Sequence, residues 1–149
     1  MEIRQVPFGG PEAQKLVTEL LGDLSMRYGG SGDDTPVSMT DFEPPDGRFF
    51  VALDGDDPVG CAGWRRHGDD AELKRMFITP AARGRGVARR LLAEIESSAR
   101  AAGLRRVILE TGDKQPEAIG LYISAGYERI PDFGYYKDHE GVLSFARSL

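Results

Sequence analysis

The sequence has very little cysteine or histidine and no long hydrophobic run at its start, and these absences exclude several classes of protein. Cys61 is the single cysteine among 149 residues, so the chain has no internal disulfide framework and fits a reducing cytoplasm. The first residues, MEIRQVPFGG, contain no long apolar stretch, so we expect neither a signal peptide nor a membrane span. The two histidines, His67 and His139, lie far apart, lack metal-ligand spacing and are expected at the surface. We therefore expect a cytoplasmic protein with no metal and no membrane partner.

Positive charge is also in the minority. The chain has 19 lysines and arginines against 24 aspartates and glutamates, which gives a net charge of -5. That balance disfavours a general nucleic-acid binder and favours a cationic partner. Apolar residues (40%) and charged residues (29%) occur at the levels of a globular protein, and the length suits one domain spanning residues 1–149. We find no internal repeat, linker or low-complexity segment.

Hydrophobic periodicity predicts an alternation of strands and helices. Strands are expected at residues 1–8, 48–53, 59–66, 71–78, 105–110, 127–130 and 141–149, and helices from Pro11 onward, at 87–102 and at 116–125. The crossover from strand 71–78 through helix 87–102 to strand 105–110 requires those two strands to run parallel. The predicted fold class is therefore α/β, with a mixed sheet packed against helices.

Helix 87–102 has the strongest helical pattern in the chain. Its apolar side chains recur on one face at positions 88, 91, 92, 95 and 99. The pairs Arg90–Glu94 and Glu96–Arg100 have the i,i+4 spacing of ion pairs on a helix surface. We therefore expect both pairs on the solvent-facing side, and we expect the helix to stop at Gly103.

Arginine and glycine are concentrated in one segment, ITPAARGRGVARRLL (78–92), between a predicted strand and the helix that begins at Val87. The first N–H groups of a helix have no partner within it, and the helix dipole adds about half a positive charge there. Gly84 and Gly86 allow the backbone to turn successive N–H groups toward one anion. Charge-assisted hydrogen bonds can come from Arg83, Arg85 and Arg89. The segment therefore predicts a site for a phosphate or pyrophosphate.

Two common phosphate-binding loops do not match this segment. The chain has no Gly-Lys-Ser/Thr triplet, and Arg89 stands where a dinucleotide-binding fingerprint requires its third glycine. A solvated basic turn at the start of a surface helix remains the alternative at this point.

Two motifs together resemble a known family. The pattern Arg83-x-x-Gly86-x-Ala88 resembles the acyl-CoA loop of the GNAT superfamily of N-acyltransferases. The segment QPEAIGLYISAGY (115–127) resembles the next helix of that family, with matching residues at Ala118, Leu121, Tyr122, Gly126 and Tyr127. The resemblance covers residues 48–127 and agrees with the element order of the whole chain. Two spaced motifs in the family's order are far more specific than either alone.

The resemblance implies a fold, an activity and a co-substrate. The fold would be a GNAT-like, mixed and mostly antiparallel sheet flanked by helices, with a central, splayed parallel strand pair. The activity would be transfer of an acetyl group from acetyl-CoA to an amine, by direct attack in a ternary complex and without a metal.

The resemblance also assigns the acetyl-CoA site. Backbone groups of Met76, Phe77 and Ile78 would hold the pantetheine arm, where strand 71–78 diverges from its parallel neighbour. The phosphates would lie on the segment Arg83, Gly84, Arg85, Gly86, Val87 and Ala88. Gln115 stands where the family often has asparagine. This position is expected near the pantetheine, and here the chain departs from the family's pattern.

The predicted catalytic residues are Tyr122 and Glu72. Tyr122 matches the tyrosine that protonates the departing thiolate in many members, and a phenol can donate such a proton. The alternative is that it only fills the space between helix and sheet. Glu72 occupies a strand position that carries a glutamate base in some relatives, although it could instead pair with Lys74 on the same strand face.

Other groups compete for the role of the base. Glu110 ends a buried strand, where a carboxylate is costly unless it is used or paired. A water relay is a third possibility for the base. Cys61 as a nucleophile is disfavoured because it lies mid-strand without a nearby histidine.

The predicted acceptor is a primary amine of a small molecule. Residues 29–47, GGSGDDTPVSMTDFEPPDG, predict a long, partly ordered loop of the kind that is often functional. Its acidic residues favour a cationic amine, namely Asp33, Asp34, Asp41 and Glu43. Three aromatic residues after residue 130 either wall the acceptor site or cover the sheet edge: Phe133, Tyr135 and Tyr136.

Two other functions stay open at this point. One is a non-catalytic module that binds acyl-CoA, and the other is acetylation of a protein or peptide amine. The net charge speaks against a nucleic-acid partner. The protein is expected to be a monomer or a homodimer.

Overall fold

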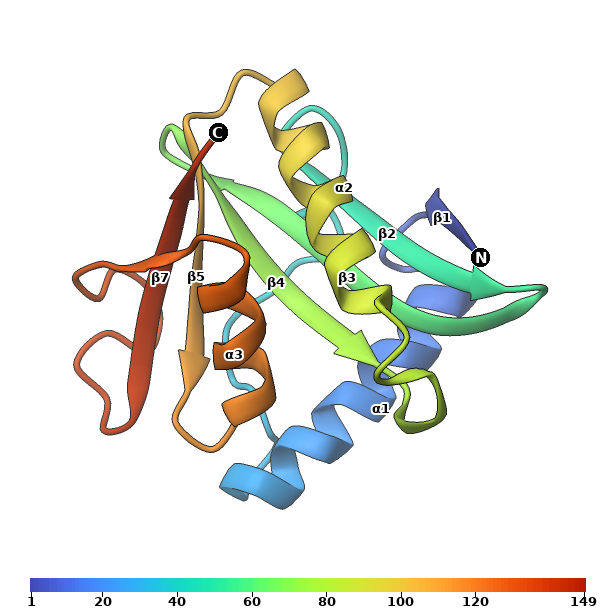
Figure 1. Cartoon of the computed structure of the whole chain (residues 1–149), viewed down its shortest axis with the longest axis horizontal. Coiled ribbons are helices and arrows are strands. Elements are labelled where there is room, and N and C mark those ends of the chain that lie inside the picture. The colour runs from blue at the N-terminus through green and yellow to red at the C-terminus, as the bar shows by residue number, and fades with distance from the viewer.

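A seven-stranded mixed sheet lies between two layers of helices in the computed structural model, which describes residues 1–149 (Figure 1). The spatial order is β1-β2-β3-β4-β5-β7-β6, with β4 and β5 parallel and the other neighbours antiparallel. The elements in chain order are β1 (Glu2–Gln5), α1 (Pro11–Tyr28), β2 (Gly47–Asp54), β3 (Asp57–His67), β4 (Asp70–Ile78), a 3-10 turn (Pro80–Ala82), α2 (Val87–Ala101), β5 (Arg106–Gly112), α3 (Pro116–Ser124), β6 (Glu128–Arg129) and β7 (Val142–Ser148). The predicted α/β fold and its parallel pair are confirmed. None of the helices is long and apolar enough to cross a membrane.

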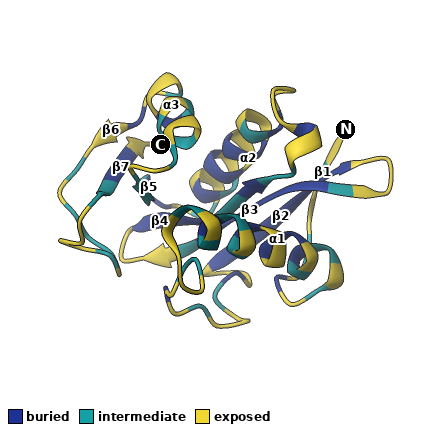
Figure 2. Cartoon of the chain, turned by 90° about the horizontal axis from the view of Figure 1, so that it is seen from below, coloured by how far each residue is buried: buried dark blue, intermediate teal, exposed yellow.

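The sheet has a separate hydrophobic core on each face. Figure 2 shows α1 beneath the sheet and α2 and α3 above it. Alternate side chains of a strand point to opposite faces, so β2 contributes Phe50 to the core under α2 and Phe49 to the core over α1. Trp64 is fully buried in the first core, and its indole N–H donates to Ser98 Oγ of α2 at 2.7 Å.

A bulge in β4 opens the middle of the sheet. β4 and β5 pair over only three positions, the last being Glu72 with Ile108. On the other side of β4 the register slips, so that Arg75 and Met76 together oppose Ala62 of β3. Arg75 has a positive φ of 58°, which is the left-handed region that residues other than glycine rarely adopt. The bulge bends β4 away from β5, and Figure 1 shows the two strands diverging toward their carboxyl ends.

The segment between α1 and β2, expected as a long loop, contains neither helix nor strand and is attached to the sheet through Phe42. Phe42 is 3% exposed, and its ring centroid lies 4.8 Å from that of Phe8 and 5.5 Å from that of Phe49. Gly63 makes room for this contact, since a Cβ there would lie 2.8 Å from Phe42 and 2.5 Å from Phe49. This aromatic cluster anchors the segment that carries Asp33.

One prediction about α2 is wrong. Glu96 is buried and does not pair with Arg100 at the surface. Its carboxylate accepts hydrogen bonds from Tyr127 Oη at 2.8 Å and from Arg147 Nη1 at 3.0 Å. The i,i+4 spacing was correct for a surface pair, but β7 and the chain after α3 cover this part of the helix and supply stronger partners.

Replacing Phe42 tests how the acidic segment is held. We expect Phe42→Ala to lower the free energy of unfolding by about 3–5 kcal/mol, because it leaves a cavity between Phe8 and Phe49. Met39→Ala, in the same segment but 57% exposed, should change it by less than about 0.5 kcal/mol. Urea denaturation of both variants measures the difference. Equal stabilities would show that the aromatic cluster does not anchor the segment.

Candidate active site

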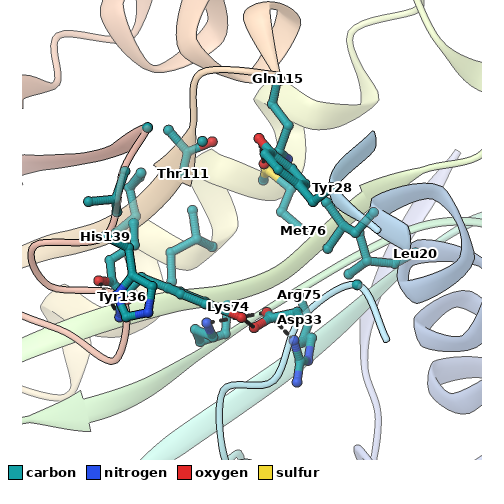
Figure 3. Close-up of a pocket in the computed structure, with 18 of the residues that line it drawn as sticks. Leu20, Tyr28, Asp33, Lys74, Arg75, Met76, Thr111, Gln115, Tyr136 and His139 are labelled. Atoms are coloured by element: carbon teal, nitrogen blue, oxygen red, sulfur yellow. Dashed lines mark hydrogen bonds and ion pairs between the residues drawn. The ribbon is translucent and has the colours of Figure 1, made fainter. Parts of the chain in front are cut away.

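A pocket of about 300 Å³ passes through the sheet where β4 and β5 diverge. Leu73 and Tyr122 reach it from the core under α2 and α3. Lys74 and Glu110 reach it from the opposite face of the sheet, because each follows a core residue, Leu73 or Leu109, directly in its strand. The end of α1, the segment after it and the chain before β7 complete the wall (Figure 3).

A cluster of charges around Asp33 forms one wall of the pocket. Asp33 Oδ1 accepts hydrogen bonds from Thr35 N at 3.0 Å, Thr35 Oγ1 at 2.6 Å and Tyr136 Oη at 2.7 Å. Its Oδ2 is ion-paired with Arg75 and lies 3.6 Å from Lys74 Nζ. Although burial raises the pKa of Asp33, Lys74, Thr35 and Arg75 outweigh it and hold the pKa well below its ordinary range. Figure 3 shows Asp33 where Lys74, Arg75 and Tyr136 converge.

Glu110 lines the pocket, and only one of its two carboxylate oxygens is hydrogen-bonded. Its Oε2 accepts the backbone N–H of Tyr136 at 3.1 Å, whereas the buried Oε1 has no hydrogen-bond partner. Burial raises the pKa of this carboxyl above the ordinary value, and the charge of Lys74 and the Tyr136 N–H offset this only in part. Glu110 is therefore a more basic carboxylate than an exposed glutamate.

Glu72 is not among the residues that line the pocket. Its side chain is 5% exposed, and its Oε1 accepts a hydrogen bond from Arg65 Nε at 3.0 Å. Arg65 in turn binds Asp41 at 2.9 Å. The alternative surface pair of Glu72 with Lys74 is also absent, because both side chains are buried and each pairs elsewhere. Of the two carboxylates considered as bases, the structure brings Glu110 to the pocket.

Tyr122 combines packing with access to the pocket. It is 6% exposed, and its ring lies 5.8 Å from that of Tyr127 and 6.4 Å from that of Phe145. Its hydroxyl makes one hydrogen bond, a weak one to Met76 Sδ at 3.8 Å. Burial raises the pKa of the phenol, so it carries its proton at neutral pH. The hydroxyl is therefore available to donate.

Gln115 is held by Tyr28, a residue that the sequence analysis did not identify. Tyr28 Oη donates to Gln115 Oε1 at 3.1 Å and accepts the N–H of Lys114 at 3.2 Å. Gly112 permits this approach, because a Cβ there would lie 2.0 Å from Tyr28 Oη. With its carbonyl oxygen engaged, Gln115 keeps its amide N–H groups unbonded in the pocket wall.

The arginine–glycine segment has the geometry of an anion site. Gly84 (φ 76°) and Gly86 (φ 79°) are left-handed, and the N–H groups of residues 84–86 donate to no backbone carbonyl. The first three N–H groups of α2 follow directly. Arg85 forms only an exposed pair with Asp54 at 3.3 Å, and such pairs are weak. Arg83 and Arg89 are held more firmly, since Arg83 Nε donates to Ile78 O at 3.1 Å and Arg89 Nη2 donates to Ser124 Oγ at 2.6 Å. The free N–H groups and the weakly paired Arg85 therefore fit a phosphate.

Of the remaining candidate residues, some line the pocket and others lie outside it. Cys61 is fully buried under α1, and its thiol donates to Arg75 O at 3.2 Å. Burial raises the pKa of that thiol, so it is a poor nucleophile. Tyr136 and the exposed His139 line the pocket, whereas Tyr135 is exposed outside it. No group of three histidine, cysteine or acidic side chains is placed to hold a metal.

Comparisons with known proteins point to one family. A model of the acetyltransferase (GNAT) family matches residues 15–127. An "IAA acetyltransferase" of Azospirillum brasilense is 46% identical over 128 residues, which cover 83% of this chain and 84% of that protein. An acyl-CoA N-acyltransferase of Klebsiella pneumoniae has the same fold, with a TM-score of 0.82 at 24% identity over 99% of this chain and 97% of the other. An aminoglycoside 6'-N-acetyltransferase complexed with coenzyme A gives a TM-score of 0.73 at 17% identity over 99% and 97%.

The reactivity of Cys61 can be measured directly. Because the thiol is fully buried, we expect no reaction with Ellman's reagent in the native protein at pH 8 and one equivalent after denaturation in guanidinium. The released chromophore is followed by absorbance. Rapid stoichiometric labelling of the native protein would contradict the buried position and reopen the nucleophile role.

Proposed function

This chain belongs to the GNAT family of acetyltransferases and is an acyl-CoA-dependent acyltransferase, and we propose that it acetylates a primary amine of a small molecule by direct attack in a ternary complex. The observation that carries the proposal is the pocket through the sheet. The pocket is lined by a basic carboxylate, Glu110, on one face of the sheet and by a proton donor, Tyr122, on the other.

Acetyl-CoA fits the groups that the chain leaves unpaired. The free N–H groups of residues 84–86 and the start of α2, with Arg83 and Arg85 beside them, would hold the pyrophosphate. Beyond Glu72 the side of β4 that faces β5 has no strand partner, so backbone groups of residues 76–78 can bind the pantetheine arm. Gln115 can add an amide N–H. Acetyl-CoA supplies the acyl group as a thioester.

Glu110 would act on the acceptor amine. An alkylammonium with a pKa of about 10 is almost fully protonated at pH 7, and removing its proton costs roughly 4 kcal/mol. Glu110, which lines the pocket and has one oxygen without a hydrogen-bond partner, would accept that proton, and the neutral nitrogen would then attack the thioester carbon. A positioned base of this kind typically contributes about 10² to 10⁴ in rate.

Tyr122 would act on the departing sulfur. Its phenol would donate a proton to the sulfur as the carbon–sulfur bond breaks and recover one from the nitrogen, which carries a positive charge after its attack and becomes the neutral amide nitrogen on losing it. The balance leaves free CoA, the acetylated amine and one proton on Glu110. The raised pKa of Tyr122 keeps the donor protonated until this step.

A CoA-release assay over a panel of amines tests the function. We expect wild type to release CoA with at least one amine, and Tyr122→Phe to lower kcat about 10²-fold or more while CoA affinity by calorimetry changes little. Tyr135→Phe, exposed and outside the pocket, is the matched control and should behave as wild type. Tight CoA binding without release for any amine would support a non-catalytic module. An unchanged kcat in Tyr122→Phe would remove the acid role.

The pH dependence separates the two carboxylates. Because the folded pKa of Glu110 is raised, its basic form is lost as pH falls through a value above the ordinary 4.5. We expect kcat/KM to fall along an acidic limb displaced upward from 4.5, and Glu110→Gln to remove that limb and lower kcat about 10²-fold or more. Glu72→Gln should keep the limb. The reverse outcome, with the limb lost only in Glu72→Gln, would assign the base to Glu72.

A further inference from the structure

Lys74 is a buried cation in the pocket wall with few hydrogen-bond partners. Its side chain is 8% exposed, and its ammonium donates one hydrogen bond, to Thr35 Oγ1 at 3.2 Å. An ammonium group has three N–H donors, so hydrogen-bonding capacity remains unused. Its single ion pair is with Asp33 at 3.6 Å, beyond hydrogen-bond distance. A buried ammonium held this loosely is costly unless another anion completes its environment.

Asp33 is shared with other donors and completes that environment only in part. Its two oxygens already accept from Thr35, Tyr136 and Arg75, and Arg75 is the closer of its two cations. Asp33 is therefore shared between two cations, and the remaining carboxylate of the pocket, Glu110, interacts with Lys74 only at a distance. The neighbouring Glu72 is bound to Arg65 and is not available to Lys74.

Glu110, in the same pocket, has an unused hydrogen-bond acceptor, whereas Lys74 has unused donors. Its buried Oε1 accepts no hydrogen bond, and Lys74 and Glu110 form no ion pair with each other. The pocket wall thus contains an ammonium group, on Lys74, with unused hydrogen-bond donors, and a carboxylate, on Glu110, with an unused acceptor. A ligand complementary to both walls carries a positive nitrogen for Glu110 and an anionic oxygen for Lys74.

We infer that Lys74 is the binding site for an anionic group of the acceptor, and that the acceptor is an amine with a carboxylate a few bonds from its nitrogen, the chemical class of the amino acids. This rests on the proposed acetyl transfer with Glu110 as the base. Once Glu110 has taken the ammonium proton, the substrate carboxylate balances the remaining positive charge of Lys74.

In the fold, the acidic segment before β2 has a different role from the one expected from its sequence. That segment favoured a cationic acceptor because of Asp33, Asp34, Asp41 and Glu43. Asp33 is ion-paired with Arg75 and Lys74, and Asp41 is ion-paired with Arg65. Asp34 and Glu43 are exposed and do not line the pocket. The acidity of the segment neutralises the chain's own cations instead of attracting a polycation.

Matched substrate pairs test the inference. Each amino acid of a panel is assayed beside the amine it would give on decarboxylation and beside its carboxamide. We expect wild type to give kcat/KM values at least about 10-fold higher for the best amino acid than for either partner, because charge-assisted bonds to a buried ammonium are lost without the carboxylate. Lys74→Met should bring that ratio close to one, mainly by raising KM for the amino acid. Lys74→Arg, which keeps the charge, should retain part of the preference.

Lys137→Met is the matched control, since Lys137 is exposed and outside the pocket and should leave the ratio as in wild type. If Lys74→Met does not fold, the wild-type ratio and Lys74→Arg decide the question. Equal turnover of amino acids and their decarboxylated partners by wild type overturns the inference and leaves the proposed function standing. A ratio that survives in folded Lys74→Met also overturns it. CoA release with no amine at all overturns the proposed function itself.

Discussion

The divergence of β4 from β5 is the constraint on which the site depends. Parallel strands normally pair along their whole length, yet this pair stops at Glu72 and Ile108. The cause is the bulge at Arg75, whose left-handed backbone costs on the order of 1–3 kcal/mol in a residue other than glycine. The Cys61 thiol donates to the backbone carbonyl of Arg75, and Asp33 is ion-paired with the Arg75 side chain. Tertiary contacts therefore hold both the backbone and the side chain of this bulge residue. The single cysteine therefore has a structural role at the bulge.

Asp33 connects the three segments that surround the pocket. Through its carboxylate it joins the chain after α1 to β4 at Lys74 and Arg75, and to the chain before β7 at Tyr136. The backbone of Tyr136 then reaches Glu110 on β5. The orientation of the proposed base is thus linked to the acidic segment by consecutive hydrogen bonds, and a change at Asp33 is expected to affect both walls.

The chain carries a net negative charge but places positive charge at two points where anions are proposed to bind. At the start of α2 the positive groups are exposed arginines and free N–H donors, which suit a large, hydrated phosphate. In the pocket the positive group is a buried lysine, which suits a small carboxylate once water is excluded. The difference in burial separates the proposed cofactor site from the proposed acceptor site.

The sequence alone determined the element order, the parallel crossover and the arginine–glycine segment, because periodicity and short motif spacing are local properties of the chain. Tertiary structure decided which charges meet, because partners such as Tyr136 and Asp33 lie 103 residues apart and Arg75 and Asp33 lie 42 apart. No local pattern marks Arg75 as a bulge residue or Tyr28 as the partner of Gln115. For the same reason strand alternation alone could not separate Glu110 from Glu72. Both carboxylates share a face of the sheet, but the divergence of the strands leaves only Glu110 in the pocket.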